Sequence, residues 1–133
     1  MEELKRHFIT SDREYREGEV FVYEQKFTVK DVKKAVFTAT ALGVYEAEIN
    51  GVKIGKQMFA PGYSYYPRRV LYQTYEVSAL LREGANTLRV YLGQGWYCGR
   101  FLCENKTQIY GEKPAVSWIL KIEDAAGVRD IVS

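Results

Sequence analysis

Aromatic side chains gather in two stretches of the sequence that also hold prolines or glycines, Lys56–Arg69 and Gly93–Ile109. A flat aromatic ring packs against the C–H face of a sugar ring, while neighbouring polar groups bond the sugar hydroxyls. The candidate carbohydrate-contacting residues are therefore Tyr63, Tyr65, Trp96, Tyr97 and Arg100. We expect the two loops to meet at one end of the domain, with Trp96 stacking on a sugar and Arg100 bonding a hydroxyl.

A second interpretation of the same residues stays open. The rings of both loops, Tyr66 and Phe101 included, can fill the end of a β-domain or pack against another domain. Tyrosine offers an apolar body with a polar tip, which suits a packing surface as well as a binding surface.

Carboxylates are present, but their positions do not predict a catalytic pair. Hydrolysis of a glycosidic bond uses two carboxyl groups at a fixed separation across a pocket. Glu46 and Glu48 lie on the outward face of a predicted hairpin, Glu76 points out of a predicted strand, and Glu83 ends a predicted helical turn. We assign no catalytic residue to this chain and expect it not to be an enzyme by itself.

The sequence holds few candidate residues for metal binding, redox chemistry or phosphate binding. One histidine, His7, and two cysteines, Cys98 and Cys103, do not supply the roughly four ligands of a structural zinc site. The cysteines are expected to be free thiols, because they lack CxxC spacing and no signal peptide precedes them. The three glycines of Gly93–Gly99 miss the dinucleotide-binding spacing by one residue, and no helix is expected to follow them.

Length and charge restrict the classes of partner. The 133 residues suit one domain, and 19 basic against 17 acidic residues give a net charge of +2. This small charge predicts no nucleic-acid partner and no anionic membrane partner. Apolar runs are too short for the ~20 residues of a membrane span. The charged N-terminus lacks the apolar region of a signal peptide, which favours a cytoplasmic protein or a trimmed chain.

The elements that position the loops are predicted to be strands. Residues 1–18 are expected to form a tail or a loose first strand, and residues 19–133 a single β-sandwich domain. The predicted strands are Glu19–Val29, Lys33–Leu42, Val44–Ile49, Val70–Val77, Asn86–Leu92, Pro114–Glu123 and Val128–Val132. Their spacing is typical of a sandwich or barrel. A last hairpin that stops at Ser133 suggests a fragment of a longer protein.

Three local signals refine this pattern. Asn50-Gly51 between two strand-like runs predicts a tight hairpin. Ser78–Gly84 is expected to form one helical turn, with Ser78 as its N-cap and Gly84 as its stop. Alternation predicts two buried faces, formed by Leu88, Val90 and Leu92 and by Val116, Trp118, Leu120 and Ile122.

Several blocks between Ala39 and Arg100 resemble one family. They read ALGVYEAEING, PGYSYY, YQTYEVS, LLREGAN and GQGWYCG in this sequence. In order and spacing they are similar to A-x-G-x-Y-E-x-x-I/L-N-G, P-G-W-T-x-Y, Y-Q-T-Y-D-V-T, L-L-x-x-G-x-N and G-D-G-W-Y-x-G, which typify the N-terminal accessory β-domain of bacterial α-L-rhamnosidases.

The resemblance implies a jelly-roll sandwich of the galactose-binding type within a larger enzyme. It implies that the parent protein releases terminal α-L-rhamnose with inversion, using acidic residues of an (α/α)₆ barrel that lies outside this chain. The other domains of the rhamnosidase are thus the expected partners. In some relatives the equivalent domain binds rhamnose with a calcium ion, and in others it is structural.

Two departures from the family pattern affect the site. Tyr63-Ser64 stands where the family has Trp-Thr, which keeps an aromatic ring. Gln94 stands where the family has aspartate, and the loss of this hard oxygen ligand argues against calcium, so no cofactor is assigned. Two functions stay open: a non-catalytic domain that contacts rhamnose-containing carbohydrate, and a structural module that packs against the catalytic barrel.

Overall fold

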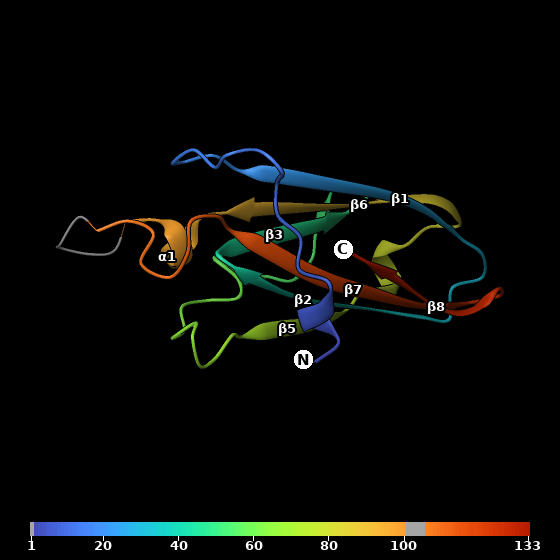
Figure 1. Cartoon of the computed structure of the whole chain (residues 1–133). Coiled ribbons are helices and arrows are strands. Elements are labelled where there is room, and N and C mark those ends of the chain that lie inside the picture. The colour runs from blue at the N-terminus through green and yellow to red at the C-terminus, as the bar shows by residue number, and fades with distance from the viewer. Residues whose placement is uncertain (1, 101–105) are drawn as a thin grey trace.

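The computed structural model describes residues 2–100 and 106–133, which form a sandwich of two antiparallel sheets (Figure 1). The strands are β1 (Phe21–Val29), β2 (Lys34–Leu42), β3 (Val44–Ile49), β4 (Val52–Lys53), β5 (Tyr72–Glu76), β6 (Gly84–Gly93), β7 (Ala115–Asp124) and β8 (Gly127–Val132). One sheet has the order β1-β6-β3-β4 and the other β5-β2-β7-β8. The all-β sandwich expected from the sequence is confirmed.

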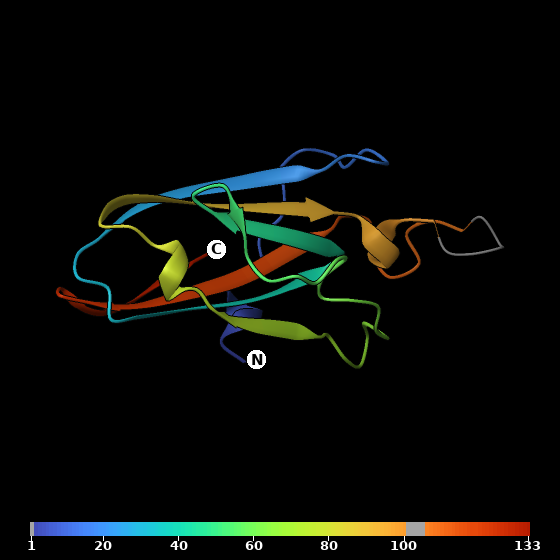
Figure 2. The ribbon, with the colours of Figure 1, turned by 180° about the vertical axis from the view of Figure 1, so that it is seen from behind.

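The core lies between the sheets and is built from alternating side chains. Leu88, Val90 and Leu92 of β6 are at most 1% exposed, and Leu120 of β7 is fully buried. Because successive strand residues point to opposite faces, these residues share the inner face of each sheet. Both predicted buried faces are confirmed, and Figure 2 shows the two sheets from behind.

The Asn50-Gly51 turn joins β3 to β4 as predicted. Both residues have positive φ, 53° and 80°, which the tight hairpin turn requires. The Asn50 side chain then fixes the turn to its surroundings. Its Nδ2 donates to the Asn86 Oδ1 at 2.7 Å and to the Leu80 carbonyl at 3.0 Å, and its Oδ1 accepts from the Thr87 N–H.

Two local predictions were wrong. The turn after β5 is a shorter 3₁₀ helix, η2 (Ser78–Leu80), and Ser78 does not cap it. The Ser78 Oγ instead accepts a hydrogen bond from the Ala35 N–H of β2 at 2.8 Å and donates one to Glu76. Gly84 does not end a helix but begins β6.

The second wrong prediction concerns the glycine-rich stretch after β6. This stretch was predicted to be a loop, but it contains a one-turn helix, α1 (Gly95–Cys98), between the glycines. Gly95 has a φ of +52°, and a Cβ at this position would lie 2.8 Å from the Val44 Cγ1. The chain therefore turns into α1 against β3, at a point that suits only glycine.

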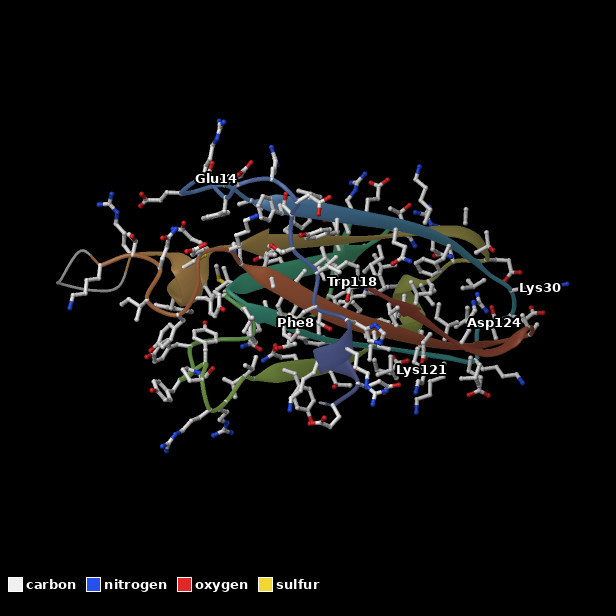
Figure 3. All side chains as sticks on the ribbon, in the orientation of Figure 1. Phe8, Glu14, Lys30, Trp118, Lys121 and Asp124 are labelled. Atoms are coloured by element: carbon white, nitrogen blue, oxygen red, sulfur yellow. The ribbon has the colours of Figure 1, made fainter. Side chains whose placement is uncertain are left out.

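The N-terminal segment crosses the second sheet (Figures 1 and 3). Its 3₁₀ helix, η1 (Leu4–Arg6), buries Leu4, whose carbonyl accepts a hydrogen bond from the Ser117 hydroxyl. Ile9 forms an antiparallel bridge with Val116 of β7 through backbone hydrogen bonds of 2.9 and 3.0 Å. The segment thus continues from the sheet toward the start of β1.

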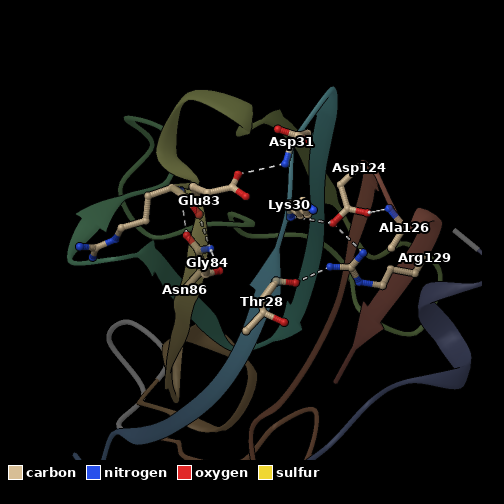
Figure 4. Close-up of polar contacts among 10 residues, drawn as sticks. Thr28, Lys30, Asp31, Glu83, Gly84, Asn86, Asp124, Ala126 and Arg129 are labelled. Atoms are coloured by element: carbon tan, nitrogen blue, oxygen red, sulfur yellow. Dashed lines mark hydrogen bonds and ion pairs between the residues drawn. The ribbon is translucent and has the colours of Figure 1, made fainter.

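A buried carboxylate joins the two sheets at the end opposite α1 (Figures 3 and 4). Asp124 is 3% exposed, and its carboxylate lies 2.9 Å from the Arg129 guanidinium. The same carboxylate accepts hydrogen bonds from the Lys30 and Ala126 N–H groups, while Arg129 donates to the Thr28 carbonyl. The hydrogen bond from Arg129 is the largest influence on the pKa of Asp124, which lies below its ordinary value.

We predict that Leu120→Ala lowers the free energy of unfolding by about 2–5 kcal/mol, because it opens a cavity in the fully packed inter-sheet core. Urea denaturation measures the change. Val128→Ala is the matched control, since Val128 is 67% exposed and is expected to lose less than about 0.5 kcal/mol. A loss near zero for Leu120→Ala would contradict the assignment of its face to the core.

We also predict a pH-dependent effect of Asp124→Asn. The lowered pKa of Asp124 stabilises the folded state above the unfolded value of about 3.9, and this stability disappears as the pH falls through the folded value. The variant should therefore have a lower Tm than the wild type at pH 7, and the gap should narrow below about pH 4. Thermal unfolding from pH 2 to 7 tests this, with the partly exposed Asp130→Asn as control. A difference in Tm between the wild type and Asp124→Asn that is equal at all pH values would contradict this prediction.

Candidate functional site

The two aromatic loops meet at the end of the sandwich that carries α1. In Figures 1 and 2 the segment before β5 and α1 lie at the same end of the molecule. The rings of Tyr63 and Trp96 are 6.1 Å apart in an edge-to-face arrangement, and those of Tyr66 and Tyr97 are 5.1 Å apart. The structure thus brings Tyr63, Trp96 and Tyr97 into one aromatic cluster.

Tyr66 occupies the centre of this cluster. It is 8% exposed and packs against Tyr97 and Tyr110, each at 5.1 Å between ring centroids. Burial raises the pKa of Tyr66 to about 12 and also raises the pKa of Tyr97. Part of the surface of Tyr97, a predicted sugar contact, is therefore covered by packing against Tyr66.

Other rings of the cluster remain open to solvent. Tyr65 is 56% exposed and Tyr63 47%, and the Tyr63 and Tyr110 hydroxyls lie 3.1 Å apart. Phe59 is 61% exposed and meets the Trp96 ring edge-to-face at 6.4 Å. Sequence reasoning missed Phe59, although its place four residues before Tyr63 in the same loop was a usable signal.

A groove of about 450 Å³ opens beside α1. It is lined by residues 17–20 of the N-terminal segment, by Val44 and Phe59, and by residues of the stretch that contains α1. Trp96 and Arg100 line this groove, whereas Tyr63, Tyr65 and Tyr97 do not. The groove therefore unites two of the five predicted contact residues with side chains that the sequence did not single out.

Charged side chains give the groove a polar part. The Arg100 Nε lies 2.7 Å from the Glu17 Oε1, and the hydrogen bond raises the pKa of Arg100. Glu19 lies 2.8 Å from Arg13. The Glu17 and Arg100 side chains are 54% and 59% exposed, so their ion pair is weak in water and can be exchanged for other partners.

Gln94 holds the N-terminal segment against the groove. Its Oε1 accepts hydrogen bonds from the Tyr15 hydroxyl at 2.7 Å and from the Gly18 N–H at 3.2 Å. Burial raises the pKa of Tyr15 to about 12. Because the Gln94 oxygen already accepts two hydrogen bonds, it is a poor fit to a calcium ligand, and residues 2–100 and 106–133 gather no three His, Cys, Asp or Glu side chains for a metal.

The remaining candidates for chemistry are few. Cys98 is a buried free thiol whose pKa burial raises to about 11. Cys103 and Phe101 lie outside the described residues.

Within the part of the chain that the structure describes, no helix is long and apolar enough to cross a membrane.

The comparisons agree with the resemblance seen in the sequence. A family model described as the α-L-rhamnosidase N-terminal domain matches residues 30–133. An α-L-rhamnosidase of Streptomyces avermitilis is 41% identical over 111 residues, which cover 84% of this chain and 11% of that protein. The chain thus spans about a ninth of the length of this relative.

Solved structures show the same relationship. A native α-L-rhamnosidase from Aspergillus terreus superposes with a TM-score of 0.85 at 33% identity, over 96% of this chain and 15% of that one. The Streptomyces avermitilis α-L-rhamnosidase, solved in complex with L-rhamnose, gives a TM-score of 0.76 at 41% identity over 86% of this chain and 11% of that one. With these matches, the chain belongs to the family of α-L-rhamnosidase N-terminal domains.

Proposed function

We propose that this chain is a non-catalytic accessory domain of an α-L-rhamnosidase and that the groove beside α1 contacts rhamnose-bearing carbohydrate. The observation that carries the proposal is the joint presence of Trp96 and the Glu17–Arg100 pair in one groove. A volume of about 450 Å³ lies within the range of small-molecule sites. The jelly-roll, galactose-binding-like topology expected from the family is part of this proposal.

The chemistry of the groove suits a sugar. The half-buried Trp96 offers an indole surface to the C–H face of the ring, and the exposed Phe59 lies edge-on beside it. Arg100 donates to a sugar hydroxyl, and Glu17 accepts from one. Since the opening is shallow and the two side chains must partly release each other, we expect weak binding, with a Kd in the millimolar range, about −4 kcal/mol.

Hydrolysis itself is assigned to other parts of the parent enzyme. The relatives are far longer than this chain, so other domains of the same protein are its nearest partners. The parent is proposed to hydrolyse terminal α-L-rhamnosides with inversion. In the groove, Glu17 and Glu19 are each held by an arginine, which does not resemble the opposed carboxyl pair of a glycosidase.

A second candidate function rests on a different set of side chains. Met58, Phe59, Tyr63 and Tyr65 are 68%, 61%, 47% and 56% exposed, and all four lie in one loop. Exposed apolar patches often mark surfaces that bind another protein or another domain. This patch supports a structural role in which the domain packs against the catalytic barrel of the parent rhamnosidase.

We predict that L-rhamnose shifts the nuclear magnetic resonance signals of residues 17–20 and 94–100 and that Trp96→Ala abolishes these shifts, because the indole supplies the stacking surface. The measurement is a titration of the 133-residue chain. Tyr72→Ala is the matched control, since Tyr72 is a 48% exposed aromatic residue on β5 that does not line the groove.

The packing function predicts a different result from the same titration. If tens of millimolar rhamnose, with or without calcium, moves no signal of residues 17–20 or 94–100, the carbohydrate proposal is wrong. A Trp96→Ala variant that only lowers the Tm would then show that Trp96 packs within the domain, and the structural function would be the one that stands.

We further predict that the purified chain releases no rhamnose from an aryl rhamnoside, because the family's catalytic acids lie in another domain. Absorbance of the released phenolate measures the activity. The Glu17→Gln variant identifies any contribution of the groove. Turnover that persists through purification and disappears in this variant would overturn the non-catalytic assignment.

A further inference from the structure

Two valines form an apolar part of the groove beside α1. Val20 and Val44 both line it, together with the rings of Phe59 and Trp96. Val44 is held against the first turn of α1, where a Cβ added to Gly95 would lie 2.8 Å from its Cγ1. Val20 is 54% exposed and follows the segment that Gln94 anchors through Gly18.

The two valines differ chemically from the charged part of the groove. Their methyl groups offer no donor or acceptor, while Glu17 and Arg100 form an ion pair at 2.7 Å. Nearby backbone groups are also occupied, since the Gly18 N–H donates to Gln94 and the Glu19 N–H donates to the Arg16 carbonyl. A ligand that bonds Glu17 and Arg100 at one edge therefore meets an apolar surface at another.

A 6-deoxyhexose matches this division of polar and apolar surface. It carries a methyl group where an ordinary hexose carries a hydroxymethyl group. A methyl group gains from contact with valine, whereas a hydroxyl placed there loses hydration without gaining a partner. L-Rhamnose and L-mannose differ only in this group. The ratio of their affinities therefore measures the effect of such a contact.

We propose that Val20 and Val44 recognise the C6 methyl group and make the groove selective for 6-deoxy sugars over their 6-hydroxy counterparts. This inference rests on the proposed carbohydrate function of the same groove. An apolar pocket rejects a ligand with one added hydroxyl by at most about 100-fold. In a groove this open, we expect L-rhamnose to bind about 5- to 10-fold more tightly than L-mannose.

The test compares both sugars on three forms of the 133-residue chain by nuclear magnetic resonance titration. Val20→Thr keeps the shape of the side chain but adds a hydroxyl, and it should reduce the preference for rhamnose to within about 2-fold. Val22→Thr is the matched control. Val22 is also 54% exposed, but it pairs with Tyr91 of β6 and does not line the groove, so the preference should persist.

The possible results separate this inference from the proposed function. Equal affinities of the wild type for the two sugars would overturn methyl recognition and leave carbohydrate binding intact. An unchanged preference in Val20→Thr would also overturn it, because the methyl group would then lie elsewhere. Failure of both sugars to bind would remove the proposed function together with the inference. Thermal unfolding of both variants checks that each substitution leaves the fold unchanged.

Discussion

The side-chain oxygen of Gln94 is the contact on which the candidate site depends. It accepts hydrogen bonds from Tyr15 and from the Gly18 N–H, at 2.7 and 3.2 Å. Tyr15 also packs edge-on against Phe21, the first residue of β1, at 5.7 Å. Since residues 17–20 line the groove, this carboxamide, together with the exposed Glu17–Arg100 ion pair, holds an N-terminal segment at a surface otherwise built by residues farther along the chain. The family pattern to which the sequence was compared has aspartate at this position, and aspartate is shorter than glutamine and carries a negative charge.

The buried strand β6, which precedes Gln94, fixes the position of this contact. β6 lies between β1 and β3, and its inward residues are nearly inaccessible to solvent. Gly93 ends β6 and α1 follows at Gly95, so packing of the core determines where Trp96 lies. At the other end of the sandwich, Asp124 and Arg129 tie β8 to the end of β1. These contacts join the two sheets, because β7 and β8 belong to one sheet and β1 to the other.

Sequence reasoning succeeded where the signal was local. The alternation in β6, the inward residues of β7 and the Asn50-Gly51 turn follow from neighbouring residues alone, and all three were confirmed. In β7 the intervening Ser117 and Ile119 are buried as well, so burial there does not alternate. Ser78 failed as a cap because a distant N–H, that of Ala35, competes for its hydroxyl. The groove was missed for a related reason. Its lining depends on the approach of distant segments, such as those of Gly18 and Gln94, which are 76 positions apart and joined by a hydrogen bond.

The two candidate functions need not compete, because they use largely different side chains. Trp96, Arg100 and residues 17–20 line the groove, whereas Tyr63 and Tyr65 lie outside its lining and are open to solvent. Phe59 belongs to both groups. A neighbouring domain that covered Tyr63 and Tyr65 would therefore leave the charged part of the groove accessible and would restrict the side formed by Phe59 and Trp96, because Trp96 contacts Tyr63. Under the proposed function, packing against the proposed catalytic domain of the parent protein would hold the groove at a defined position relative to the proposed substrate.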